Sequence, residues 1–124
     1  MKRLLAVVFG LLFVFTGCAS EDRTDITRGE IVTAYESAGY AVQSFVCDGE
    51  VDVEGLTDYI VASHPSGEDV YFDFFSTETA AREYAADMAS RKLPEEQIES
   101  YGKIVVTYCR AEHFVPFAEL LEGK

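Results

Sequence analysis

Hydrophobic residues recur along the chain at two spacings, and these spacings predict where helices and strands lie. A spacing of three and four residues is typical of a helix with one buried side, whereas strict alternation is typical of a half-buried strand. Helical spacing is found within residues 27–39, 76–92 and 112–121. Alternating or continuous apolar character is found at 40–47, 56–63, 69–75 and 103–109. The predicted order of elements is therefore α-β-β-β-α-β-α.

Local signals support the first four of these elements. Thr27 and Glu30 have the spacing of a capping box, which satisfies free backbone N–H groups at a helix start, and Gly39 suits the helix end. Asp48-Gly49 is typical of a hairpin turn, and residues 64–67 form a second break rich in turn residues. These signals predict one helix followed by two hairpins.

In the second half of the chain, the signals for the ends of helices and strands are weaker. Ser76 is a suitable cap for the second helix, which we expect to end at Lys92-Leu93-Pro94. Residues 95–102 are polar and are interpreted as a connection, and residues 103–109 are rich in β-branched side chains, as in a strand. A last helix is predicted from about Glu112. A helical crossover would then make the fourth strand parallel to the third.

The first eighteen residues have a different character from the rest. A basic start, Met1-Lys2-Arg3, precedes an uncharged run from Leu4 to Phe15 that is shorter than the roughly 20 residues needed to span a bilayer. The run ends in Phe15-Thr16-Gly17-Cys18, which resembles the lipobox of bacterial lipoproteins, with Phe in place of the more usual Leu. The resemblance implies a signal peptide at residues 1–17 and a lipidated Cys18 at the mature N-terminus. It extends over residues 1–18 only and implies attachment to the extracytoplasmic side of the cell membrane, not an activity.

The remainder is interpreted as a polar tether, residues 18–26, and a single small α+β domain, residues 27–124. The leader holds two basic residues and no acidic ones, so removing it changes the formal net charge from −12 to −14. A domain this acidic repels the phosphates of nucleic acids, so we expect no nucleic-acid partner.

Assigning Cys18 to lipid leaves Cys47 at the end of the first predicted strand and Cys109 at the end of the fourth. In an extracytoplasmic setting this pair predicts a disulfide, which requires the first and fourth strands to be neighbours. The sheet would then be four-stranded and mixed, with the order third-second-first-fourth and the helices packed mainly on one face. Two buried free thiols are the alternative. A zinc site using His113 with both thiols has little support, because it lacks paired ligand spacing.

An acidic stretch follows the first strand, with carboxylates at every second position: Asp48, Glu50, Asp52 and Glu54. Oxygen ligands at such spacing occur in calcium loops, but the bidentate glutamate at the twelfth place is missing. A solvated hairpin edge explains the pattern better, since charges at an edge also prevent strand pairing between molecules. We therefore predict neither a metal nor a cofactor.

The second face of the sheet carries the best candidate for function. Residues that should share it are Phe45, Tyr59, Val61, Tyr71, Phe75, Val105 and Thr107, interrupted by Gln43 and Asp73. Such a face is either covered by the last helix or open to an envelope protein or small ligand. With no catalytic motif in the chain, a non-enzymatic binding or accessory module is the leading hypothesis. The alternatives are a small envelope hydrolase or metal-dependent enzyme using Asp73, His64 or His113, and a purely structural envelope protein.

Overall fold

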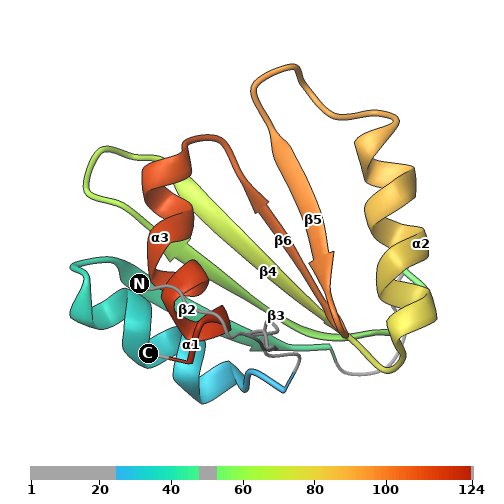
Figure 1. The fold of residues 1–124 in the computed structure, drawn as a ribbon, viewed down its shortest axis with the longest axis horizontal. Coiled ribbons are helices and arrows are strands. Elements are labelled where there is room, and N and C mark those ends of the chain that lie inside the picture. Colours follow the sequence, from blue (N-terminus) through green and yellow to red (C-terminus); the bar gives the residue numbers. More distant parts are fainter. Residues whose placement is uncertain (1–24, 48–52, 124) are drawn as a thin grey trace, which may run out of the picture.

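The computed structural model describes residues 25–47 and 53–123, which form three helices and a five-stranded sheet (Figure 1). The elements in chain order are α1 (Arg28–Ser37), β2 (Ala41–Val46), β3 (Leu56–Ser63), β4 (Asp69–Phe75), α2 (Glu78–Ala89), β5 (Gln97–Tyr101), β6 (Ile104–Tyr108) and α3 (Ala111–Leu121). The α+β class predicted from the sequence is confirmed. The leader, Cys18 and the turn at residues 48–49 lie outside the described residues.

Helix α1 begins as its sequence predicts. The Thr27 hydroxyl accepts a hydrogen bond from the Glu30 N–H at 3.2 Å, and the Glu30 carboxylate accepts one from the Thr27 N–H at 2.9 Å. The helix ends before Gly39, whose φ of 93° suits a residue without a Cβ. The capping box is therefore present at the predicted residues.

The strand order is β2-β3-β4-β6-β5, and every pair of neighbours is antiparallel. Strands β2 and β4 run parallel to each other, as the two predicted hairpins require. The predicted four-stranded mixed sheet with the order third-second-first-fourth is wrong, because α2 leads into β5 rather than directly into β6. A tight turn at Gly102, with φ of 60°, then brings β6 back between β4 and β5.

Strand β5 was predicted as a polar connection because it carries polar side chains on both faces, so apolar and polar residues do not alternate along it. Ile98 packs beneath α2, while Glu99 faces the other way. The Glu99 carboxylate accepts hydrogen bonds from the hydroxyls of Tyr101 and Tyr108, the latter at 3.0 Å. A half-buried glutamate thus occupies a position where an apolar residue would have allowed the strand to be predicted from the sequence.

Two of the three described helices pack on one face of the sheet, and the third packs on the other face. Helices α1 and α3 cover one face, and α2 lies along the other (Figure 1). The larger core lies under α1 and α3 and includes Ile31, Tyr35, Ile60, Val70, Phe72, Val106, Phe117 and Leu121. The smaller core lies under α2 and consists of Phe75, Ala81, Ala85 and Val105 with partly buried neighbours.

The other two helices start within one residue of their predicted positions. Helix α2 is capped by Thr77 rather than Ser76, and the Thr77 hydroxyl accepts from the Ala80 N–H at 3.0 Å. Helix α3 begins at Ala111 without a side-chain cap. Pro116 lies inside this helix, in its second turn.

Candidate functional site

The strand register places the predicted second-face residues in two rows across the sheet. One row runs Gln43, Val61, Tyr71 and Thr107; the next runs Phe45, Tyr59, Asp73 and Val105. Rows of this kind lie on one face because side chains alternate along each strand. The residues that the sequence assigned to this face therefore do share it.

Helix α2 covers only part of this face, and the part over β2, β3 and the middle of β4 is open. Phe45 and Tyr71 are 39% and 42% exposed. Phe45 stacks on Tyr59 with ring centroids 4.8 Å apart. Phe75, by contrast, is buried beneath Tyr84 of α2, with ring centroids 5.1 Å apart. We call the surface formed by Gln43, Phe45, Tyr59, Val61, Tyr71 and Asp73 the open face.

Asp73 lies at the boundary between the open face and the covered part of the sheet. It stands opposite Tyr59 on β3 and Val105 on β6. It has no hydrogen bond or ion pair with any residue that the structure describes, and burial raises its pKa to about 6. A largely buried carboxylate without a compensating cation is destabilising, so this position is not explained by stability.

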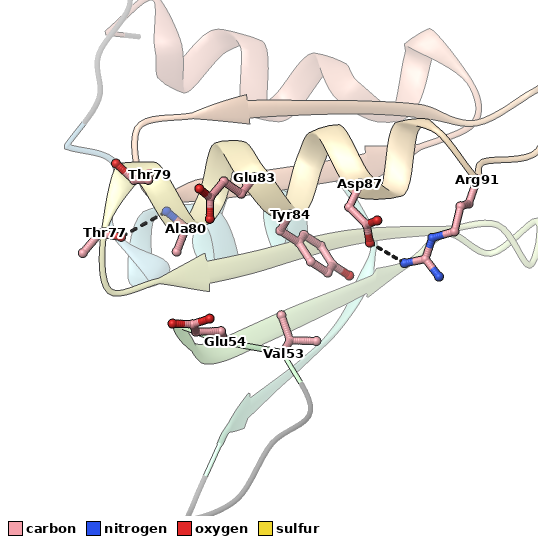
Figure 2. Close-up of a pocket in the computed structure, with 9 residues that line it drawn as sticks. All are labelled: Val53, Glu54, Thr77, Thr79, Ala80, Glu83, Tyr84, Asp87 and Arg91. Carbon is pink, nitrogen blue, oxygen red and sulfur yellow. Dashed lines mark hydrogen bonds and ion pairs between the residues drawn. The ribbon is translucent and has the colours of Figure 1, made fainter.

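A cavity of about 450 Å³ lies alongside α2, lined by Val53, Glu54, Thr77, Thr79, Ala80, Glu83, Tyr84, Asp87 and Arg91. Figure 2 shows Tyr84 projecting from α2 toward the strands, with Glu54 and Val53 across the cavity. Arg91 is already paired with Asp87 at 2.5 Å, which leaves Glu54 and Glu83 as carboxylates in excess. The cavity is therefore negatively charged. Tyr84 packs on the buried Phe75 ring, and burial together with the nearby Asp73 carboxylate raises the pKa of Tyr84.

The calcium interpretation rests on the acidic residues after β2, and the zinc interpretation rests on His113 with the two thiols. Asp48, Glu50 and Asp52 lie outside the described residues, and Glu54 lines the cavity beside α2. Among residues 25–47 and 53–123, no three His, Cys, Asp or Glu side chains gather as metal ligands.

Cys47 and Cys109 are free thiols, and the predicted disulfide between them is wrong for this fold. Strands β3 and β4 separate β2 from β6, which places the two strands about 14 Å apart. The two strands also run antiparallel, so the cysteines follow opposite ends of the sheet. The prediction failed because the strand order was inferred from the two cysteines themselves. Without β5, the last strand was also expected to run in the same direction as β2, whereas it runs in the opposite direction.

A second polar cluster joins α3 to the start of β2 and the turn before β4. His113 is buried, its Nε2 lies 2.8 Å from the Glu68 carboxylate, and its Nδ1 lies 2.6 Å from the Tyr40 hydroxyl. Because an ionised carboxylate only accepts, the neutral ring carries its proton on Nε2, and Nδ1 accepts from Tyr40. The His64 ring lies 4.6 Å from the His113 ring. Sequence reasoning named both histidines but gave no signal that they meet.

The residues named for a hydrolase do not form one site. His64 and His113 lie together beside Tyr40, whereas Asp73 lies on the opposite face of the sheet. Both ring nitrogens of His113 are occupied by Glu68 and Tyr40. This cluster fastens α3 to the rest of the domain.

No protein-family model matches the chain, and neither curated protein sequences nor solved structures contain a significant match. Within the part of the chain that the structure describes, no helix is both long and apolar enough to cross a bilayer.

Proposed function

We propose that this protein is a lipid-anchored, extracytoplasmic binding module that is not an enzyme, and that the open face is its binding surface. The anchor is the lipid on Cys18 implied by the lipobox at residues 15–18. Two acyl chains hold a protein stably at a membrane, whereas one is marginal. The partner is an envelope protein or a small ligand.

The observation that carries the binding proposal is the combination of exposed aromatic rings with Asp73. Phe45 and Tyr71 offer flat apolar surfaces. Asp73 follows Tyr71 by two residues on β4 and stands opposite Tyr59, the residue on which Phe45 stacks. The Asp73 carboxylate has no cationic partner among the described residues. A ligand that stacks an apolar group on these rings and places a cationic group beside Asp73 would satisfy both features. The acidic charge of the domain also favours a cationic ligand.

Membrane attachment is tested by fractionating cells that express the chain with and without Cys18→Ser. We expect the unchanged chain to stay with the membrane after washing with salt and carbonate, while Cys18→Ser enters the aqueous fraction. Incorporation of a palmitate analogue should depend on Cys18 in the same way. An equally membrane-bound, unlabelled Cys18→Ser chain would contradict the anchor.

Binding at the open face is tested by placing a photo-activated cross-linking residue at Tyr71 in native membranes. The matched control places it at Ala86, which is exposed on α2. We expect a discrete cross-linked product, or protection by a small ligand, from position 71 and not from position 86. Identical outcomes at both positions would remove the open face as the binding surface.

A further inference from the structure

Strand β2 forms one edge of the sheet, and within Ala41–Val46 it lacks the charges and prolines that usually prevent an edge from pairing with another molecule; the acidic stretch that follows it in the sequence begins only at Asp48. The strand Ala41–Val46 contains no charge and no proline, and its register with β3 is continuous. Five of its six residues are exposed, and Val46 is 63% exposed. The other edge, β5, carries Glu99 and follows Pro94 and two further glutamates. Only one edge of the described sheet is thus unprotected.

The direction of the free backbone groups on β2 follows from one hydrogen bond. The Cys47 N–H donates to the Thr57 carbonyl at 2.9 Å, in register with the β2–β3 ladder. Because bonded and non-bonded positions alternate in an antiparallel pair, Gln43 and Phe45 also bond toward β3. The N–H and C=O groups of Val42, Ser44 and Val46 therefore point outward, away from the sheet.

We propose that β2 binds a second copy of this chain, antiparallel, about a two-fold axis at Ser44. This register pairs Ser44 with Ser44 of the second copy, and Val42 with Val46 of the second copy. All the outward donors and acceptors are then satisfied by about six backbone hydrogen bonds between the copies. The two five-stranded sheets become one continuous sheet.

This register is self-complementary in its side chains as well as in its backbone. Directly opposite residues of an antiparallel pair lie on the same face, so Val46 covers Val42 of the second copy, and Phe45 lies beside Gln43 of the second copy. A two-fold axis at any other residue of β2 leaves at least one outward-facing residue without an outward partner. The open faces of the two copies also meet edge to edge, which makes one longer aromatic surface.

The paired strands bring no like charges together, although the chain as a whole is acidic. Strand β2 carries no ionisable group, and Asp58, which stands opposite Val46 on β3, is paired with Arg28 at 2.7 Å. Like charges therefore do not meet at the axis, and the remaining repulsion is screened beyond about 8 Å at physiological salt. Pairing of one six-residue strand buries less area than a permanent dimer, so we expect a concentration-dependent association.

The register is tested by disulfide trapping of Ser44→Cys in the full chain with Cys47→Ser and Cys109→Ser. Opposite Cα atoms in a bonded pair lie about 5.5 Å apart, which is within disulfide range. We expect the cross-linked dimer in native membranes to form at least about tenfold faster than in the matched Ala86→Cys chain, because pairing raises the effective thiol concentration. The same background without an added cysteine reports any contribution from Cys18.

A second variant tests the backbone itself. The Ser44 N–H points outward, so Ser44→Pro removes an inter-copy donor without removing a bond to β3. Sedimentation of the full chain in detergent should show a monomer–dimer equilibrium that Ser44→Pro shifts to monomer at unchanged circular dichroism. Equal trapping rates for Ser44→Cys and Ala86→Cys, or trapping of a different protein at Ser44→Cys, would overturn self-pairing. If Ser44→Pro does not fold, the comparison of trapping rates between Ser44→Cys and Ala86→Cys alone tests self-pairing at β2.

Discussion

Replacing Asp73 with asparagine removes a carboxyl group that β4 holds in a largely buried position between Tyr59 and Val105. Burial raises the pKa of Asp73 from 3.8 to about 6. The folded state therefore binds this proton more tightly than the unfolded state does. Stability is lost as the pH rises from about 4 to 6, and the loss is complete above that range.

The magnitude follows from the two pKa values. A difference of one pKa unit corresponds to 1.36 kcal/mol, so the ionised Asp73 costs about 2 to 3 kcal/mol near pH 7.5. An asparagine amide does not ionise, so the variant would not carry this cost. Asp73→Asn should therefore stabilise the domain by about 2 to 3 kcal/mol at pH 7.5 and by close to zero at pH 4. Other groups that titrate in this range cancel in the comparison.

The assay is urea unfolding of the unchanged chain and Asp73→Asn at several pH values between 4 and 7.5. Glu119→Gln, an exposed carboxylate on α3, is the matched control and should change stability by less than about 0.5 kcal/mol at both ends. Stabilisation by Asp73→Asn that does not depend on pH, or destabilisation at pH 7.5, would refute the reasoning. The first would mean that ionisation is not the cause, and the second that the carboxylate has a stabilising partner.

Three further predictions concern the rest of the domain. Tyr40→Phe leaves the buried Nδ1 of His113 without its donor and should destabilise the domain by about 1 to 2 kcal/mol in the same urea assay; an unchanged midpoint would contradict this. Phe117→Ala empties the centre of the larger core and should cost about 3 to 5 kcal/mol; a loss under 1 kcal/mol would contradict the packing. Cys47 and Cys109 should both be alkylated without reduction, as mass spectrometry can show. Cys109 should react more slowly at pH 7.5 than an unperturbed cysteine, because desolvation and nearby carboxylates raise its pKa.

Local signals in the sequence predicted local structure well. The Thr27–Glu30 pair predicted the start of α1, and the alternation around Phe45, Tyr59 and Tyr71 predicted a shared sheet face. These features depend on residues close in sequence or on the period of a strand. Features of this kind can be predicted from the sequence without knowing which distant residues come into contact.

The features that the sequence missed depend on contacts between distant residues. Strand β5 is stabilised by Glu99, a polar side chain whose partners are Tyr101 and Tyr108, so no apolar alternation marked it. Missing that strand changed the strand order and gave the wrong cysteine pairing. The meeting of His64 with His113 likewise depends on how α3 packs, and no spacing in the sequence encodes it.

Oxidative footprinting in native membranes tests the binding account most directly. Tyr71 and Phe45 on the open face are partly exposed in the isolated domain, as are Leu93 and Val115 on other surfaces, at 58% and 49%. If the open face binds a partner, Tyr71 and Phe45 should be less oxidised in native membranes than in the purified chain, with Leu93 and Val115 unchanged. Protection of Phe45 alone would indicate pairing at β2 without a ligand. Equal oxidation of Tyr71 in both preparations would contradict binding at the open face.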